Sequence, residues 1–462
     1  MAVDLTRGKI GKTMLQFAWP MMVGNLLQQM YNVADTLIVG QFLGKDALAA
    51  VGSAYALMTF LTSILLGLCM GSGVKFSICF GGEEKDGLKN SFFLSFVMIG
   101  VLTAVLNLGV FLGLDGILEL LQVPGEVYPL MREYLWVIFW GISATFVYSF
   151  FASVLRAVGN SVTPLIFLGI SAVLNIILDL VFVLTFSWGV AGAAAATVLS
   201  QYVSGIGIAV YSLWKFPGLR PGRRHMRWSG KVVKEIFQLS FLTCIQQSVM
   251  NFGILMVQGL VNSFGPAVMT AFAAAVKIDS FAYMPVQDFG NAFSTFIAQN
   301  YGAGKKERIR RGIRSAALTS FLFCVVISLG VCLFARPLLL IFIRPEETEI
   351  LSIGIQYLWI EGAFYCLIGW LFLFYGFYRA MKRPGMSVIL TVISLGVRVI
   401  LAYTLSAVPE IGVAGIWAAV PIGWFLADLV GILYYFRRKS RLLGEAAAAG
   451  KENILKNEET MV

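Results

Sequence analysis

Residues 91–113 read SFFLSFVMIGVLTAVLNLGVFLG, a run without any charged side chain. An α-helix needs about 20 apolar residues to cross the hydrocarbon core of a bilayer, so this run is long enough for one span. Similar runs recur along the whole chain. We therefore predict an all-α polytopic membrane protein with twelve transmembrane helices, at about residues 13–39, 48–76, 91–113, 133–155, 163–186, 190–214, 235–262, 267–299, 315–343, 351–379, 386–408 and 413–436.

The composition excludes the main alternatives to a membrane protein. The chain has 462 residues, of which 58% are hydrophobic and 13% charged, and its mean hydropathy is +0.81. Ordinary soluble domains carry roughly 25% charged residues, and disordered chains combine low hydrophobicity with high charge. The apolar runs are long and continuous, whereas a β-barrel shows short alternating segments.

The positive charges indicate how the chain is oriented. Most of the 35 Lys and Arg residues precede the first span, lie in alternate connections or belong to the C-terminal tail. The connections on the other side contain only Lys45, Arg132, Arg336 and Arg344. Cytoplasmic loops are rich in Lys and Arg, so we expect both termini to be cytoplasmic. The net charge of +10 follows from this topology and requires no nucleic-acid partner.

An internal repeat divides the chain into two related halves. Arg156-Ala157 recurs as Arg379-Ala380, and the segment Gly189-Val-Ala-Gly recurs as Gly412-Val-Ala-Gly, both at an offset of 223 residues. Six spans per half give both halves the same orientation, so we expect two bundles related by a pseudo-two-fold axis along the membrane normal. The predicted parts are an N-terminal bundle, a basic cytoplasmic connection, a C-terminal bundle and a loose cytoplasmic tail, at residues 1–214, 215–234, 235–440 and 441–462.

Two carboxylates inside the spans are the leading functional candidates, because charges in a bilayer are costly. Gln28, Asn32 and Asp35 share one face of the first span, and Asn175 and Asp179 lie one turn apart in the fifth. Their oxygens suit a small hard cation, and two adjacent carboxylates can also share a proton. The alternative is a structural polar contact between packed helices.

The repeat assigns this acidic pair to the first half alone. At the offset of 223, Asn175 corresponds to Arg398 and Asp179 to Ala402. We therefore expect ion coupling in the N-terminal bundle. In the second half, Asp288 and Arg398 either neutralise each other or line a cavity. Further candidates for a polar cavity wall are Gln201, Gln247 and Asn251.

The sequence gives little support for metal binding, ATP hydrolysis or enzyme catalysis. The single histidine, His225, lies in a basic run, and the six cysteines lack metal-ligand spacing. No GxxxxGK[ST] phosphate loop occurs, so ATP is not the expected energy source. We expect neither an enzyme nor a resident cofactor. Gly71-Ser72-Gly73 is predicted to be a small-residue packing site.

The chain resembles the MATE family, the multidrug and toxic compound extrusion transporters, over residues 10–440. The matching segments are Ala34-Asp35-Thr36, Asn175 to Asp179, Gly189 to Ala193 and Ala298 to Lys305. The pattern is most similar to bacterial and archaeal members whose carboxylates lie in the N-terminal bundle. Other branches use a Glu in span seven and an Asp in span ten, where this chain has Gln246 and Gln247 and no acid in residues 364–378.

The resemblance implies a function and a set of site residues. Asp35, Asn175, Asp179 and Thr197 would bind the coupling ion, H⁺ or Na⁺, with Gln28 and Tyr31 in the same pocket. The protein would be a monomeric antiporter in a bacterial inner membrane. It would export drug-like, often cationic or amphipathic compounds by alternating access through a cavity between the two bundles. The transported compound, the coupling ion and the direction of transport in the cell stay open.

Three other functions fit the sequence less well than antiport. A lipid-linked sugar flippase shares this architecture, but its cavity should be strongly cationic, and Arg398 is the one clear deep arginine. An integral-membrane enzyme would need a catalytic constellation, which a single histidine makes hard to build. A channel would need a repeated pore filter, which the sequence does not contain.

Overall fold

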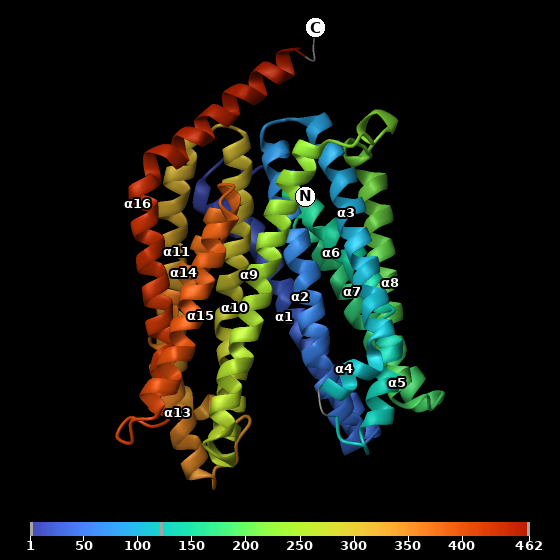
Figure 1. The fold of residues 1–462 in the computed structure, drawn as a ribbon, viewed down its shortest axis with the longest axis vertical. Helices are drawn as coiled ribbons and strands as arrows, with labels where there is room; N and C mark the ends of the chain where they lie inside the picture. Colours follow the sequence, from blue (N-terminus) through green and yellow to red (C-terminus); the bar gives the residue numbers. More distant parts are fainter. Residues whose placement is uncertain (1–2, 121–122, 460–462) are drawn as a thin grey trace. The chain divides into compact units, whose positions relative to one another are not determined.

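The computed structural model describes residues 3–120 and 123–459, apart from the side chains of residues 45, 120, 252–255 and 451–459. The described residues form helices joined by short turns, without a strand among them (Figure 1). The all-α prediction is therefore confirmed. Residues 460–462 of the predicted tail lie outside the described residues.

The helices of the first half follow the predicted spans closely. They are α1 (Ile10–Phe42), α2 (Lys45–Gly81), α3 (Lys85–Leu112), α4 (Leu114–Leu120), α5 (Tyr128–Ile138), α6 (Gly141–Ala157), α7 (Val162–Asp179), the π-helical turn η1 (Leu180–Thr185) and α8 (Gly189–Lys215). The connection holds two 3₁₀ turns, η2 (Pro217–Leu219) and η3 (Arg223–His225).

The second half repeats this order of elements. Its helices are α9 (Gly230–Asn262), α10 (Pro266–Gly302), α11 (Lys306–Leu333), α12 (Ala335–Leu339), α13 (Thr348–Gly362), α14 (Tyr365–Ala380), α15 (Pro384–Ser406) and α16 (Ala414–Glu459).

Within the described residues, nine helices are long and apolar enough to cross a membrane, and two bent pairs, α5 with α6 and α13 with α14, raise the number to 11. Helix α1 has 33 residues but is not among these apolar helices. It covers the first predicted span, residues 13–39, so each predicted span has a helix in the structure.

The repeat is visible in the backbone as well as in the sequence. The bent pairs, at 44° and 50°, occupy equivalent places in the two halves. Gly159 and its repeat partner Lys382 both have positive φ, at 83° and 58°, and so do Gly189 and Gly412, at 59° and 52°. A lysine rarely adopts this conformation, so the shared turn reflects the duplicated fold and not the residue type.

The chain divides into two compact units. Unit 1 contains residues 1–3, 19–80 and 84–244, and unit 2 contains residues 4–18, 81–83 and 245–462. Helices α1 and α9 are therefore each divided between the units, and α2 contributes its last residue, Gly81, to unit 2. The division falls inside α9, beyond the basic connection of residues 215–234.

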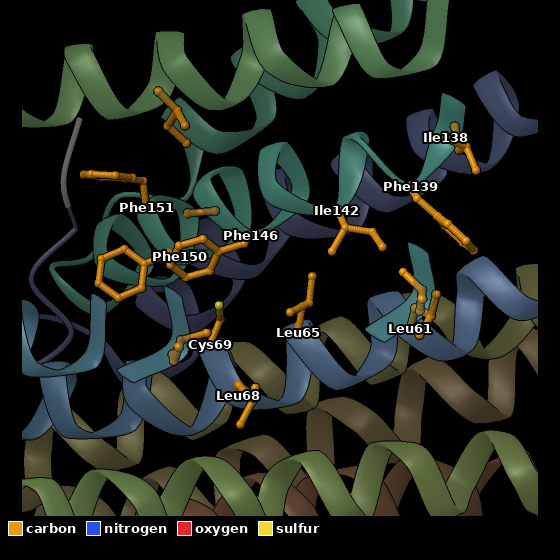
Figure 2. Close-up of a cluster of buried hydrophobic side chains, with 14 of the residues drawn as sticks. Leu61, Leu65, Leu68, Cys69, Ile138, Phe139, Ile142, Phe146, Phe150 and Phe151 are labelled. Carbon is orange, nitrogen blue, oxygen red and sulfur yellow. The ribbon is translucent and has the colours of Figure 1, made fainter. Parts of the chain in front are cut away.

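The core of unit 1 lies between α2 and α6 (Figure 2). Leu65 and Cys69 of α2 belong to the same buried cluster as Ile142 and Phe150 of α6. The ring of Phe150 meets that of Phe92 at 5.2 Å in an edge-to-face arrangement. Such pairs favour one packing geometry over others of equal burial.

Helix α2 approaches α9 closely within unit 1. A Cβ on Gly67 would lie 2.5 Å from the Cα of Cys244, and one on Gly71 would lie 2.4 Å from the Cα of Ser240. The hydroxyls of Ser72 and Ser240 are 2.9 Å apart and hydrogen-bonded. Small residues spaced by four let two helix backbones meet in a membrane. The predicted packing role of the glycines around Ser72 is thus confirmed.

Helix α16 continues well past the bilayer-length segment. Residues 441–459, expected to form a loose tail, are helical. Leu442 and Leu443 are buried, and Glu445 forms an ion pair with Arg383 at 2.8 Å. The tail expectation was wrong because its alanine-rich sequence has high helix propensity and its apolar side chains find a surface on unit 2.

Candidate functional site

Asp35 and Asp179, the two carboxylates predicted to act together, do meet within unit 1. Asp35 lies in the second half of α1, and Asp179 is the last residue of α7. Their side chains interact directly. Asp35 is half-buried, whereas Asp179 is 0% exposed. The helices that hold them are separated by more than a hundred residues in the chain, so only packing brings the pair together.

The backbone changes its winding at Asp179. Helix α7 ends there, and the next six residues form the π-helical turn η1. π-Helical segments are rare and are found most often at functional sites.

Asn175 and Thr197 complete the predicted group of four. The side-chain amide of Asn175 donates a hydrogen bond to the hydroxyl of Thr197, with 3.2 Å between Nδ2 and Oγ1. Asn175 is 1% and Thr197 6% exposed. Because the amide nitrogen is engaged, the amide oxygen of Asn175 is directed away from Thr197 and stays available to another group.

The oxygens of this site are poorly satisfied by the protein itself. Asp35 Oδ1, Asn175 Oδ1 and both carboxylate oxygens of Asp179 are buried and have no hydrogen-bond partner among the described residues. Buried polar atoms normally have partners. A cluster of buried acceptor oxygens with two acidic groups and no basic one suits a proton or a small monovalent cation.

Two tyrosines border the acidic pair. Tyr31, expected from the family pattern, and Tyr134, which the sequence did not single out, both interact electrostatically with Asp35 and Asp179. Tyr134 lies on α5 directly after Arg132 and Glu133, at the start of a predicted span, and nothing in its neighbourhood marks it as a site residue. Its one sequence signal is the repeat, because Tyr134 corresponds to Tyr357 at the offset of 223.

The remaining candidates in unit 1 have varied surroundings. Gln28 is exposed, and Asn32 is half-buried and donates a hydrogen bond to Gln29 at 3.1 Å. Gln201 accepts a hydrogen bond from Thr145 at 3.3 Å. Gln201 therefore contributes to packing between α6 and α8 in this structure.

The candidates in unit 2 lie on three helices, α9, α10 and α15. Gln247 and Asn251 are half-buried on α9, and Asp288 is buried on α10. Arg398 of α15 has Asp279 and Glu361 as electrostatic partners. Neither of these acids was expected to belong to a site.

Histidine, cysteine, aspartate and glutamate do not gather in groups of three or more that could hold a metal ion anywhere in the described parts of the chain. Asp35 and Asp179 contribute two carboxylates, and the other oxygens around them come from amide and hydroxyl groups. Such a donor set fits a weakly held monovalent ion better than a transition metal.

Comparison with known proteins identifies the family. The MatE family model matches residues 20–181 and 240–404. The probable multidrug resistance protein YpnP of Bacillus subtilis (strain 168) is 30% identical over 449 residues, covering 94% of this chain and 96% of the relative. The chain belongs to the MATE family. It is therefore a multi-pass membrane protein of a transporter family, as the resemblance implied.

Other members of the MATE family agree in length and fold. The probable multidrug resistance protein NorM of Thermotoga maritima is 28% identical over 444 residues, covering 93% of each chain. A crystal structure of MATE in complex with MaL6 superposes with a TM-score of 0.90 at 24% identity, covering 96% of this chain and 99% of that one. This MATE-family chain thus shares the fold over almost its full length.

Proposed function

We propose that this MATE-family transporter is a cation-coupled multidrug antiporter in which H⁺ or Na⁺ binds at Asp35, Asn175, Asp179 and Thr197. The observation that carries the proposal is the meeting of Asp35 and Asp179 among buried oxygens that lack hydrogen-bond partners. The relatives named as multidrug resistance proteins support export of drug-like compounds.

The coupling chemistry follows from the charges of the site. With both carboxylates ionised, two negative charges lie close together in a poorly hydrated region, which is unfavourable. Binding of one cation removes part of that repulsion and stabilises the packing of α1 against α7. Release of the cation restores the repulsion and favours a different helix arrangement. Each charge that crosses the membrane supplies about 2.3 kcal/mol per 100 mV.

The test is transport of a fluorescent organic cation in proteoliposomes, under a Na⁺ gradient and a pH gradient imposed separately. Wild type would be compared with Asp35→Asn and Asp179→Asn. A matched control is Asp46→Asn, which changes an exposed carboxylate at the start of α2. We expect gradient-driven transport to be lost in the two site variants and kept in the control.

The gradient that drives wild-type transport names the coupling ion. Undiminished gradient-driven transport in both site variants would refute the assignment of the coupling site. Absence of transport in wild type under either gradient would refute organic-cation antiport and direct attention to other cargo, lipid-linked sugars first.

A further inference from the structure

An apolar groove lies within unit 2, where α11, α14 and α16 pack against one another (Figure 1). Its volume is about 200 Å³, and its walls consist almost wholly of carbon atoms. The polar atom of Trp370 on α14 is already engaged, because the indole N–H donates a hydrogen bond to the carbonyl of Ala317 at 3.3 Å. Phe436, one of the lining residues, is 67% exposed. The groove is therefore open on one side and offers a guest apolar contacts.

Positive side chains continue the groove on α11. Four residues of this helix are spaced at i, i+3, i+4 and i+7 and so share one face, namely Arg310, Ile313, Arg314 and Ala317. Ile313 and Ala317 line the groove. The two arginines therefore lie on the groove-forming face, toward the start of α11.

The same spacing recurs on α16. Ile432, Tyr435 and Phe436 line the groove, and Lys439 follows them at i+7 from Ile432. The amine of Lys439 is 5.9 Å from the ring centre of Tyr435. Tyr435 also interacts electrostatically with both arginines of α11. Three positive side chains thus surround Tyr435 at one end of the groove.

These three cations have little negative charge to balance them. Among the described side chains, the acid paired with them is Glu307, whose carboxylate is 3.9 Å from Arg310 and 66% exposed. Such a surface ion pair contributes little. Arg310 Nε is buried and has no hydrogen-bond partner among the described residues. Buried polar atoms normally have partners, so this end of the groove is suited to an anion.

The combination fits a molecule with an anionic head and a hydrocarbon chain. Guanidinium groups bind phosphate through paired hydrogen bonds, and an acyl chain would fill the groove through dispersion contacts. Leu318 on α11 and Leu433 on α16 lie beside the groove in sequence and are exposed, as expected of residues that face lipid. A soluble anion would use the cations and leave the apolar walls uncovered.

The position of the cations along the helices agrees with a lipid of the inner leaflet. They lie at the start of α11 and near the basic end of α16, the ends that we expect at the cytoplasmic face. Anionic lipids give that leaflet a negative surface potential, and basic pockets between transmembrane helices bind their head groups.

We propose that this groove is a binding site for an anionic phospholipid of the surrounding bilayer. The phosphate lies between Arg310, Arg314 and Lys439, and one acyl chain lies along Trp370 and Phe374. The site goes beyond the proposed antiport and does not depend on the ion that drives it.

The test is quenching of tryptophan fluorescence by brominated phospholipids. The purified full-length protein would be reconstituted in phosphatidylcholine nanodiscs with an increasing mole fraction of brominated phosphatidylglycerol, and in parallel with brominated phosphatidylcholine. Bromine on an acyl chain quenches a tryptophan that it contacts, and the difference between wild type and Trp370→Phe isolates the signal of Trp370. We expect this signal to saturate at a low fraction of phosphatidylglycerol and to follow the bulk composition with phosphatidylcholine.

Charge variants test the contact with the head group. Arg310→Gln, Arg314→Gln and Lys439→Gln should each raise the mole fraction of phosphatidylglycerol at half-maximal quenching about fivefold, because each removes one basic residue near the lipid phosphate. Arg311→Gln is the matched control. It removes the same charge from an exposed neighbour that is not on the groove-forming face, so it should behave as wild type.

A size variant tests the contact with the chain at constant charge. Ala317→Phe fills the groove and should reduce quenching of Trp370 by brominated phosphatidylglycerol. Leu318→Phe adds bulk at the exposed neighbouring position and should leave the quenching unchanged. If Ala317→Phe does not fold, the charge variants still decide the question.

The inference is overturned if both lipids quench Trp370 equally at equal mole fraction, since the groove would then accept any bilayer lipid. It is also overturned if Arg311→Gln weakens quenching as much as Arg310→Gln, since net charge alone would then act. Competition by glycerol phosphate would show a phosphate site that needs no lipid chain.

A second copy of the chain is the remaining occupant to separate. Absence of quenching by either lipid, together with a dimer in light scattering, would assign the groove to that copy and refute the lipid site. The measurement contains no transport step. Its failure therefore leaves the proposed coupling site standing, and loss of the coupling site leaves the lipid site standing.

Discussion

Thr197 determines how Asn175 faces the acidic pair. Its hydroxyl accepts the hydrogen bond of the Asn175 amide at 3.2 Å, which fixes the orientation of an amide whose oxygen and nitrogen would otherwise exchange places. Asn175 then presents an oxygen one turn from Asp179. The Thr197 hydroxyl on α8 therefore decides that Asn175 presents its oxygen, and not its nitrogen, to the site formed by α1 and α7.

Thr197→Val should weaken this arrangement with almost no change in shape. We expect a loss of stability of about 1–3 kcal/mol, because the Asn175 amide becomes a buried donor without an acceptor, and a higher coupling-ion concentration for half-maximal transport. Thr103→Val is the control, since the buried Thr103 hydroxyl donates a hydrogen bond to the carbonyl of Ile99 in its own helix. Thermal unfolding and transport would be measured on both. Equal effects of the two substitutions would contradict the role of Thr197.

The single histidine holds the basic connection to α3. His225 Nδ1 accepts from the backbone N–H of Gly222 at 3.0 Å, and Nε2 lies 2.8 Å from Asp86 Oδ1. We expect His225→Ala to weaken this attachment by about 1–2 kcal/mol and to speed tryptic cleavage at Arg223, Arg224 or Arg227 about tenfold. The exposed Met226→Ala is the control. Unchanged cleavage in His225→Ala would show that the connection is held by other contacts.

The seam between α2 and α9 depends on the absence of side chains at two positions. Gly67 and Gly71 allow backbone approach, and an added Cβ would collide with backbone atoms of α9, which cannot move aside as a flexible side chain could. The neighbouring ion pair of Lys75 and Glu235, at 2.7 Å, extends the same seam. The contact between α2 and α9 is therefore specified by small residues on one face of α2.

Gly71→Ala and Gly52→Ala form a matched pair on α2. The first places a methyl group 2.4 Å from the Cα of Ser240, whereas the second meets nothing within 4 Å. Alanine in a helix is favoured over glycine by up to about 1 kcal/mol, so Gly52→Ala should be neutral or stabilising. Gly71→Ala should lower the unfolding temperature and the yield of folded protein. A Gly71→Ala protein as stable as the Gly52→Ala protein would contradict close packing of α2 on α9.

The whole molecule combines two repeats that share helices. Helices α1 and α9 each contribute residues to both units. Within unit 2, the segment that precedes α1 is held by Asn300, whose side-chain amide donates a hydrogen bond to the carbonyl of Leu5 at 3.1 Å.

The orientation of the whole chain is open to a direct test. Cysteines would be introduced at Ser229, in the basic connection, and at Ser263, between α9 and α10. In intact cells a membrane-impermeant thiol reagent should label Ser263→Cys, and it should reach Ser229→Cys only after the membrane is opened. The native cysteines, all buried or half-buried, provide the wild-type background. Labelling in the opposite order would invert the proposed topology.

The sequence was informative where a local rule applied. Apolar length predicted the spans, and the spacing of Asn175 and Asp179 predicted a shared helix face. The same reasoning did not assign Tyr134, Asp279 and Glu361 to a site, because residues that they interact with lie on other helices. It also took residues 441–459 for a loose tail, since it could not show that Leu442 and Leu443 have a surface to cover.

The sequence alone determined the membrane class, the spans and the presence of a carboxylate inside the first and the fifth of them. These properties depend on length, periodicity and the cost of placing a charge in lipid, and all of them act within one helix. Only the tertiary structure decided which polar groups meet. Asp279, Glu361 and Arg398 come from three helices, and their joint charge balance arises from packing that no local pattern encodes.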